Sequence, residues 1–176
     1  MRAALLAACM LLLSGCASWI GPPLLQIPPA ALGRERTLEQ RVVFERQSER
    51  MSFESVLEID AERLRMVATA MGLRLFSLDY DGHAIEQGAG LPMPRGLPPE
   101  WVVDDTLFVL APTAALDAAL PESWRLEDSG RQRRVFLGER LIVEVRRDSD
   151  DPDNGHAELI QHALGYRLSI DTREVE

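Results

Sequence analysis

Apolar and polar residues alternate with a period of two along most of the chain beyond residue 37. Successive side chains of a β-strand point to opposite faces, so this alternation predicts strands with one apolar face. Residues 51–60, 64–68, 76–80, 124–128, 133–137 and 141–147 all show it. The apolar positions that we expect to line a core or a cavity are Met51, Phe53, Leu57, Leu64, Met66, Phe76, Leu78, Leu141, Val143 and Val145.

The middle of the chain has a different pattern. A loop rich in glycine and proline over residues 88–99 leads into Glu100, and proline followed by an acidic residue favours the first turn of a helix. We expect one short helix up to Pro112 and a second over 113–120, ended by Pro121. Asp104 and Asp105 are interpreted as the solvent-facing side of this helical lid, whose apolar residues are Trp101, Val102, Leu107 and Phe108.

These elements predict a mainly β fold with two or three short helices. Asp81-Gly82 and Asn154-Gly155 favour tight hairpin turns, so neighbouring strands are expected to be antiparallel. Nine or ten strands with so few helices predict a sheet that curls on itself, as an open half-barrel with a helical lid. We expect a single domain over residues 38–176.

The first sixteen residues have the layout of a secretory signal: one arginine, an apolar run over residues 3–13, then small residues. As a helix this run would span about 16 Å, against about 30 Å for the hydrocarbon core of a bilayer, so a permanent transmembrane helix is not expected. Leu13-Ser14-Gly15-Cys16 resembles the lipobox of bacterial lipoproteins. The resemblance implies removal of a signal peptide over 1–15 and attachment of acyl chains such as palmitate to Cys16; the alternative is an ordinary signal with an incidental cysteine.

Residues 16–37 contain four prolines, at 22, 23, 28 and 29, which favour an extended and semi-rigid chain. We therefore predict a tether between Cys16 and the domain. The alternative is that the segment lies on the domain through Leu24, Leu25 and Ile27. Ala17 rather than aspartate follows Cys16, which in enterobacterial lipoproteins implies export to the outer membrane, here on its periplasmic face.

The charge of the chain and the motifs it lacks argue against several classes of function. The chain has 28 acidic residues against 19 arginines, no lysine and a net charge of −9, which argues against a nucleic-acid partner. We find no nucleophile motif, HExxH or CxxC, and His83, His156 and His162 fall in separate predicted strands. The aspartates over 148–153 lack the spacing of a calcium loop and are interpreted as a solvated hairpin. No catalytic residue, metal ion or cofactor is predicted, and we expect a monomer.

One predicted turn is apolar where polar residues are usual. It reads Thr69-Ala70-Met71-Gly72, and Leu73 follows. One interpretation is that Ala70, Met71 and Leu73 contact a membrane or lipid. The other is that the turn is buried, under a helix or at a closed end of the barrel.

Residues 63–67 and 70–82 resemble the central stretch of the LolA/LolB superfamily of lipoprotein carriers. Residues 101–120 and 165–170 are similar to an uncharacterised lipoprotein family related to it, which is often encoded beside aryl-polyene biosynthesis genes. The resemblance implies an apolar cavity for acyl chains, a turn at Met71 that assists membrane insertion, and no catalysis. It implies a lipoprotein that receives a lipid or acylated cargo, including from a periplasmic carrier protein; the alternative is a scaffold lipoprotein that binds a protein through a sheet edge or its acidic face.

Overall fold

The structure is a computed structural model that describes residues 24–88 and 97–175. Cys16 and the predicted signal peptide lie outside this part of the chain, as does most of the loop before the first α-helix. In chain order the elements are η2 (Pro29–Leu32), β1 (Arg36–Arg46), β2 (Glu49–Ile59), β3 (Leu64–Ala70), β4 (Leu73–Tyr80), β5 (Ile85–Gln87), α2 (Pro99–Leu110), α3 (Thr113–Ala119), β6 (Trp124–Asp128), β7 (Gln132–Leu137), β8 (Arg140–Arg147), β9 (Gly155–Gln161) and β10 (Tyr166–Val175). No helix among the described residues is long and apolar enough to span a bilayer.

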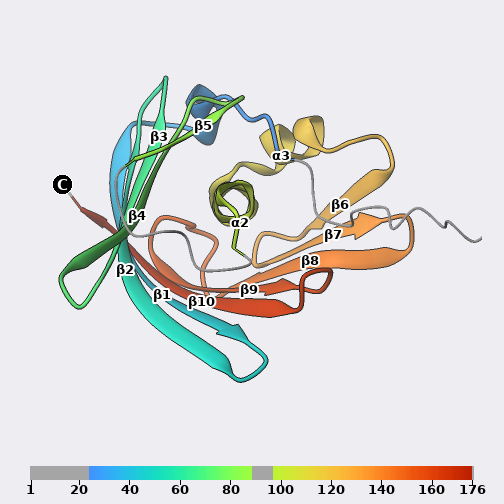
Figure 1. Cartoon of the computed structure of the whole chain (residues 1–176). Coiled ribbons are helices and arrows are strands. Elements are labelled where there is room, and N and C mark those ends of the chain that lie inside the picture. Colours follow the sequence, from blue (N-terminus) through green and yellow to red (C-terminus); the bar gives the residue numbers. More distant parts are fainter. Residues whose placement is uncertain (1–23, 89–96, 176) are drawn as a thin grey trace, which may run out of the picture.

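All ten strands belong to one antiparallel sheet with the order β5-β4-β3-β2-β1-β10-β9-β8-β7-β6. Neighbours in the sheet are consecutive in the chain except for β1 and β10, which pair at its centre. The sheet curls around α2 and leaves β5 and β6 as separate edges (Figure 1). This confirms the predicted fold class, an open and curled antiparallel sheet with few helices.

The inner, concave face of the sheet carries the predicted apolar positions. Along β2, side chains at odd positions from Phe53 to Ile59 are buried, whereas the even positions are exposed. On β3 and β4 the same alternation buries Leu64, Met66, Phe76 and Leu78. Period two therefore identified the buried face of these strands correctly, because each strand is covered on one side only.

Leu141 is an exception to the predicted face. The register between β7 and β8 shifts after Val135, which pairs with Val143, so that Phe136 pairs with Leu141. The shift inserts Ile142 as an extra, fully buried residue and leaves Leu141 half-buried beside Phe136 on the outer face. The prediction that Leu141 faces the same way as Val143 was wrong because a β-bulge reverses the alternation at this point.

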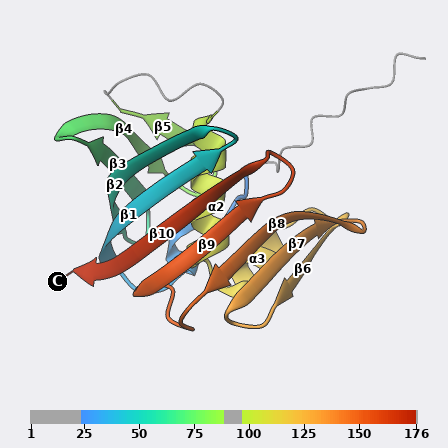
Figure 2. The same ribbon diagram turned by 90° about the horizontal axis from the view of Figure 1, so that it is seen from below.

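Helix α2 lies within the curve of the sheet, against its inner face, rather than as a lid on its rim (Figures 1 and 2). Its residues from Val103 to Leu110 are all buried, including Asp104 and Asp105. Apolar side chains occur on every side of this helix, and such a helix is stable only when it is surrounded. The prediction that the two aspartates face solvent was therefore wrong.

The chain just before β1 packs on the domain rather than acting as a tether. Leu25 and Ile27 are each 1% exposed, and Leu32 in η2 is also buried. Tyr80 on β4 donates its hydroxyl to the carbonyl of Leu25 at 2.5 Å and accepts the N–H of Ile27 at 3.0 Å. The packed alternative describes residues 24–37 correctly, and the tether prediction is wrong for them.

Candidate functional site

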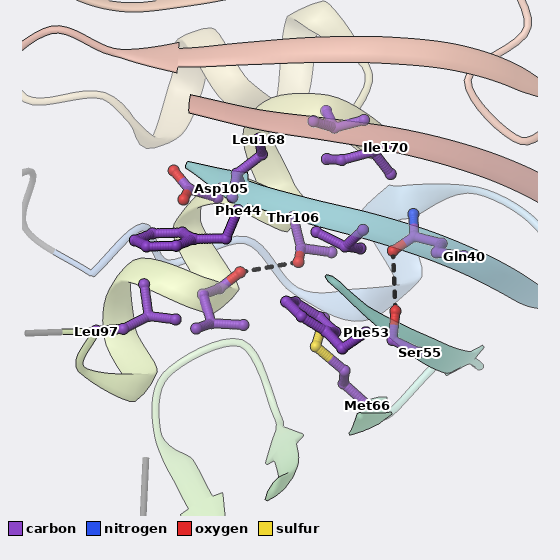
Figure 3. Close-up of a pocket in the computed structure, with 13 residues that line it drawn as sticks. Gln40, Phe44, Phe53, Ser55, Met66, Leu97, Asp105, Thr106, Leu168 and Ile170 are labelled. Carbon is purple, nitrogen blue, oxygen red and sulfur yellow. Dashed lines mark hydrogen bonds between the residues drawn. The ribbon is translucent and has the colours of Figure 1, made fainter. Parts of the chain in front are cut away.

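A narrow cleft separates α2 from the inner face of the sheet (Figure 3). Its volume is about 40 Å³. Sites for small ligands usually measure about 300–1,000 Å³, and one water needs about 10–15 Å³. In this conformation the cleft has room for a few waters. The described residues that line the cleft are Gln40, Val42, Phe44, Phe53, Ser55, Met66, Leu97, Val102, Asp105, Thr106, Val109, Leu168 and Ile170.

The predicted cavity residues divide into two groups. Phe53 and Met66 on the sheet and Val102 on α2 line the cleft. The other predicted positions lie away from it: Leu57, Leu64, Phe76, Leu78, Val143, Val145, Leu107 and Phe108 are buried in the core, and Met51 and Trp101 are half-buried. Phe53 and Phe76 meet edge to face with ring centroids 6.1 Å apart, so the wall of the cleft continues directly into the core.

Four polar residues of the cleft were not predicted: Gln40, Ser55, Asp105 and Thr106. Gln40 and Ser55 stand at inward positions between apolar residues of β1 and β2. The sequence signal that could have revealed them is a polar residue at a position where the alternation of the strand predicts an apolar one.

Two buried carboxyl groups hold α2 in place. Asp104 accepts the backbone N–H of Leu25 at 2.8 Å, and Asp105 accepts from the Gln161 amide at 2.7 Å and the Tyr166 hydroxyl at 2.5 Å. Burial raises the pKa of Asp104 to about 8 and that of Asp105 to about 7, and these hydrogen bonds only partly oppose the effect. Neither carboxyl has an ion-pair partner among the described residues. The pKa values therefore mean that Asp104 favours the neutral form at neutral pH, whereas Asp105 changes protonation state close to it.

Two arginines from the sheet hold the C-terminal end of α2. Arg133 on β7 donates to the carbonyl of Phe108 at 2.7 Å, and Arg147 on β8 donates to the carbonyl of Val109. Cations are favourable at a helix C-terminus because they satisfy its free carbonyls and oppose its dipole. Arg133 also forms a buried ion pair with Asp128 at 2.7 Å.

The contacts of α2 leave several buried polar atoms without partners. Among the described side chains, the buried atoms that lack a hydrogen bond are Trp101 Nε1, Asp104 Oδ2, Arg147 Nε and Gln161 Oε1. All four belong to α2 or to a side chain that binds it. Each such group lowers the free energy of unfolding by about 1–3 kcal/mol. The unpartnered buried polar side-chain atoms of the described core are therefore concentrated around α2.

The apolar turn between β3 and β4 protrudes into solvent. Met71 and Gly72 both have positive φ, 51° and 74°, which is the conformation of a two-residue hairpin turn. The Met71 side chain is 97% exposed and Leu73 is 61% exposed, while Ala70 is half-buried. The alternative of a buried turn is therefore wrong; contact with a membrane stays a prediction.

The histidines do not form a metal site with the other described residues. His156 lies 2.7 Å from the Asp171 carboxylate on the outer face, and His162 is 3.8 Å from Glu144. No group of three or more histidine, cysteine, aspartate or glutamate side chains in residues 24–88 and 97–175 is arranged to hold a metal ion.

Residues 37–174 match a family described as "Protein of unknown function (DUF3261)". The chain belongs to this family. That membership confirms the expectation of an uncharacterised family for the domain, whereas lipidation and the aryl-polyene gene neighbourhood stay predictions. No curated protein matches the sequence.

Solved structures that resemble this DUF3261 protein include the following two. One is a LolA superfamily protein, NE2245, from Nitrosomonas europaea, with a TM-score of 0.45, 8% identity, and coverage of 79% of this chain and 84% of that chain. The other is a DUF1329 family protein from Desulfovibrio piger, with a TM-score of 0.37, 9% identity, and coverage of 82% and 86%. At these values neither structure says what the present chain binds.

Proposed function

We propose that this protein is a non-catalytic lipoprotein that binds an acyl chain between the inner face of its sheet and α2. The observation that carries the proposal is the cleft, in which apolar side chains of the sheet face a helix that is itself imperfectly held. Acylation of Cys16 would anchor the protein to the outer membrane on the periplasmic side. The cargo would be a lipid or an acylated protein, handed over without covalent chemistry.

Binding requires α2 to move, because the cleft of about 40 Å³ is too small for an acyl chain. The acyl chain would take the place of Val102 and Val109 of α2 against the inner face of the sheet. Each buried methylene contributes about 0.8 kcal/mol, so ten of them contribute roughly 8 kcal/mol toward displacing the helix. The unpartnered polar atoms around α2 lower the cost of that displacement, since water can satisfy them once the helix moves.

The exposed turn supports a role at a membrane. Met71 and Leu73 place apolar surface at the tip of a hairpin, where nothing in the described domain covers it. A flexible and polarisable methionine side chain suits insertion between lipids. We assign to this turn the contact through which cargo passes between protein and bilayer.

The test uses Trp101, which lies on α2, as a fluorescent reporter. The chain has three tryptophans, so the full-length protein with Cys16→Ser, Trp19→Phe and Trp124→Phe reports on α2 alone and carries no acyl chain of its own. Adding 1-monopalmitoylglycerol is expected to shift the Trp101 emission to the red with saturation, because α2 leaves its seat. Glycerol alone serves as the control ligand.

A Trp101 emission that does not respond, together with no copurified or added lipid in native mass spectra, would contradict acyl-chain binding. A scaffold function would then be the better account. It is favoured by the open edge of β6, whose backbone groups on one side have no strand partner among the described residues.

A further inference from the structure

Three polar side chains form a row on the inner face of the sheet, and two of them, Gln40 and Ser55, line the cleft. Gln40 on β1 is the direct cross-strand neighbour of Ser55 on β2 and of Thr172 on β10. All three are buried, with 8% exposure or less. Apolar rows lie on both sides of them: Phe53, Val42 and Ile170 on one side, and Leu57 and Leu38 on the other.

The hydrogen bonds within this polar row are long and leave capacity unused. Ser55 donates to Oε1 of Gln40 at 3.4 Å, and Nε2 of Gln40 donates to the Thr172 hydroxyl at 3.2 Å. A glutamine amide has two N–H donors and two acceptor lone pairs. Within the described structure Gln40 therefore keeps one donor and one acceptor free, on a side chain that lines the cleft (Figure 3).

The lack of a cation among the described lining residues disfavours the binding of anions in the cleft. Asp105 is the one ionisable side chain among the described lining residues, and no arginine or histidine lines the cleft there. A phosphate or carboxylate that entered would lose its hydration without gaining a cation, and an unpaired buried charge is very costly. An ester or amide carbonyl needs only a hydrogen-bond donor, which Gln40 has.

We propose that the Ser55–Gln40–Thr172 row selects cargo whose acyl chain is linked through an uncharged ester or amide. The carbonyl of that linkage accepts the free N–H of Gln40, and the hydrocarbon lies along Phe53 and Met66. This inference rests on the proposed function and names the chemical class of its ligand. Free acylglycerols and acylated protein N-termini both contain this group.

The experiment measures dissociation constants with the Trp101 reporter in the full chain carrying Cys16→Ser. The probes are 1-monopalmitoylglycerol, a short peptide with an N-palmitoylated N-terminus, hexadecyl phosphate and hexadecane. We expect the ester and amide probes to bind at least tenfold more tightly than hexadecyl phosphate. Whichever of the ester and amide probes binds more tightly identifies the source of the cargo, an acylglycerol or an acylated protein. Both results support the inference.

Variants separate the polar row from the cleft itself. Gln40→Leu is expected to weaken ester and amide binding by about tenfold and to leave hexadecane binding unchanged, since about one hydrogen bond is lost. Ser55→Ala should reduce the same preference by a smaller factor, and it carries the test if Gln40→Leu does not fold. Ser52→Ala makes the same change on the outer face of β2, where the side chain is exposed, and should alter nothing.

The inference is overturned if hexadecyl phosphate binds as tightly as the ester, if Gln40→Leu and Ser55→Ala leave the preference intact, or if Ser52→Ala removes it equally. Equal binding of all four probes overturns the selection by the polar row and leaves acyl-chain binding in place. Binding of none overturns both.

Discussion

Replacing Asp105 by asparagine tests how the buried carboxyl group of α2 makes stability depend on pH. The asparagine oxygen can still accept from Gln161, and its amide can donate to the phenolic oxygen of Tyr166, so the shape of the contact is kept. What the variant loses is the ability to ionise. Its stability relative to the parent should therefore depend on pH, whereas a change in packing alone would not.

The sign and size of this dependence follow from the pKa. Burial raises the pKa of Asp105 from 3.8 to about 7. The folded state thus keeps a proton that the unfolded chain has released, and the contribution of Asp105 to stability falls as pH rises from about 4 to about 7. Between pH 5 and pH 8 this covers about two pH units at about 1.4 kcal/mol each, or about 3 kcal/mol.

The assay is urea unfolding of the full chain with Cys16→Ser at pH 5 and pH 8, monitored by circular dichroism. Relative to the parent, the free energy of unfolding of Asp105→Asn is expected to be about 3 kcal/mol higher at pH 8 than at pH 5. Asp60→Asn is the control: Asp60 is exposed, and the backbone N–H groups of Glu62 and Arg63 lower its pKa, so its carboxylate is ionised in both the folded and the unfolded state at pH 5 and pH 8, and its effect on stability should be the same at both. An Asp105→Asn effect that is equal at both pH values would refute a carboxyl kept neutral by burial.

Three further predictions follow from the described contacts. Met71→Ser should weaken binding to phospholipid vesicles by tenfold or more in co-sedimentation, because burying a methionine side chain contributes about 1.5–3 kcal/mol. Arg133→Leu should lower the free energy of unfolding by about 3 kcal/mol in urea titrations, because it leaves the buried Asp128 without its cation. Tyr80→Phe should lower that free energy by about 1–3 kcal/mol and speed proteolysis of residues 24–28, because both hydrogen bonds to this segment are lost.

Two of these changes, Met71→Ser and Arg133→Leu, have a matched comparison. Gln47 lies in another hairpin turn with a positive φ of 55°, and Gln47→Ser should leave vesicle binding unaltered. Arg134 neighbours Arg133 on the more exposed face of β7, so Arg134→Leu should change stability by less than 1 kcal/mol. Vesicle binding that survives in Met71→Ser, or equal losses of stability in the two arginine variants, would contradict the assigned contacts.

The strands were predictable because one face of the sheet is buried and the other is exposed to solvent. On β2 and β3, period two alone identified the buried face, since no bulge interrupts the alternation in β2. At Leu141 the same rule failed, because the register shift depends on how β7 and β8 pair and leaves no mark in one strand's composition. Pairing is a property of two segments, whereas alternation is a property of one.

The site was less predictable than the sheet. Two adjacent aspartates usually indicate a wet helix face, yet Asp104 and Asp105 are buried because separate parts of the fold supply their donors. Those donors, at Leu25 and Gln161, are distant in sequence from α2. The polar row at Gln40 was visible in the sequence as a break in an apolar phase, but its position across three strands depends on the pairing of β1 with β10.

The pairing of β1 with β10 also constrains how the domain is made. The last of the ten described strands in chain order, β10, occupies the centre of the sheet, and until it pairs no strand pairing joins β1–β5 to β6–β9. The sheet is therefore complete only once β10, Tyr166–Val175, has paired with β1 on one side and β9 on the other.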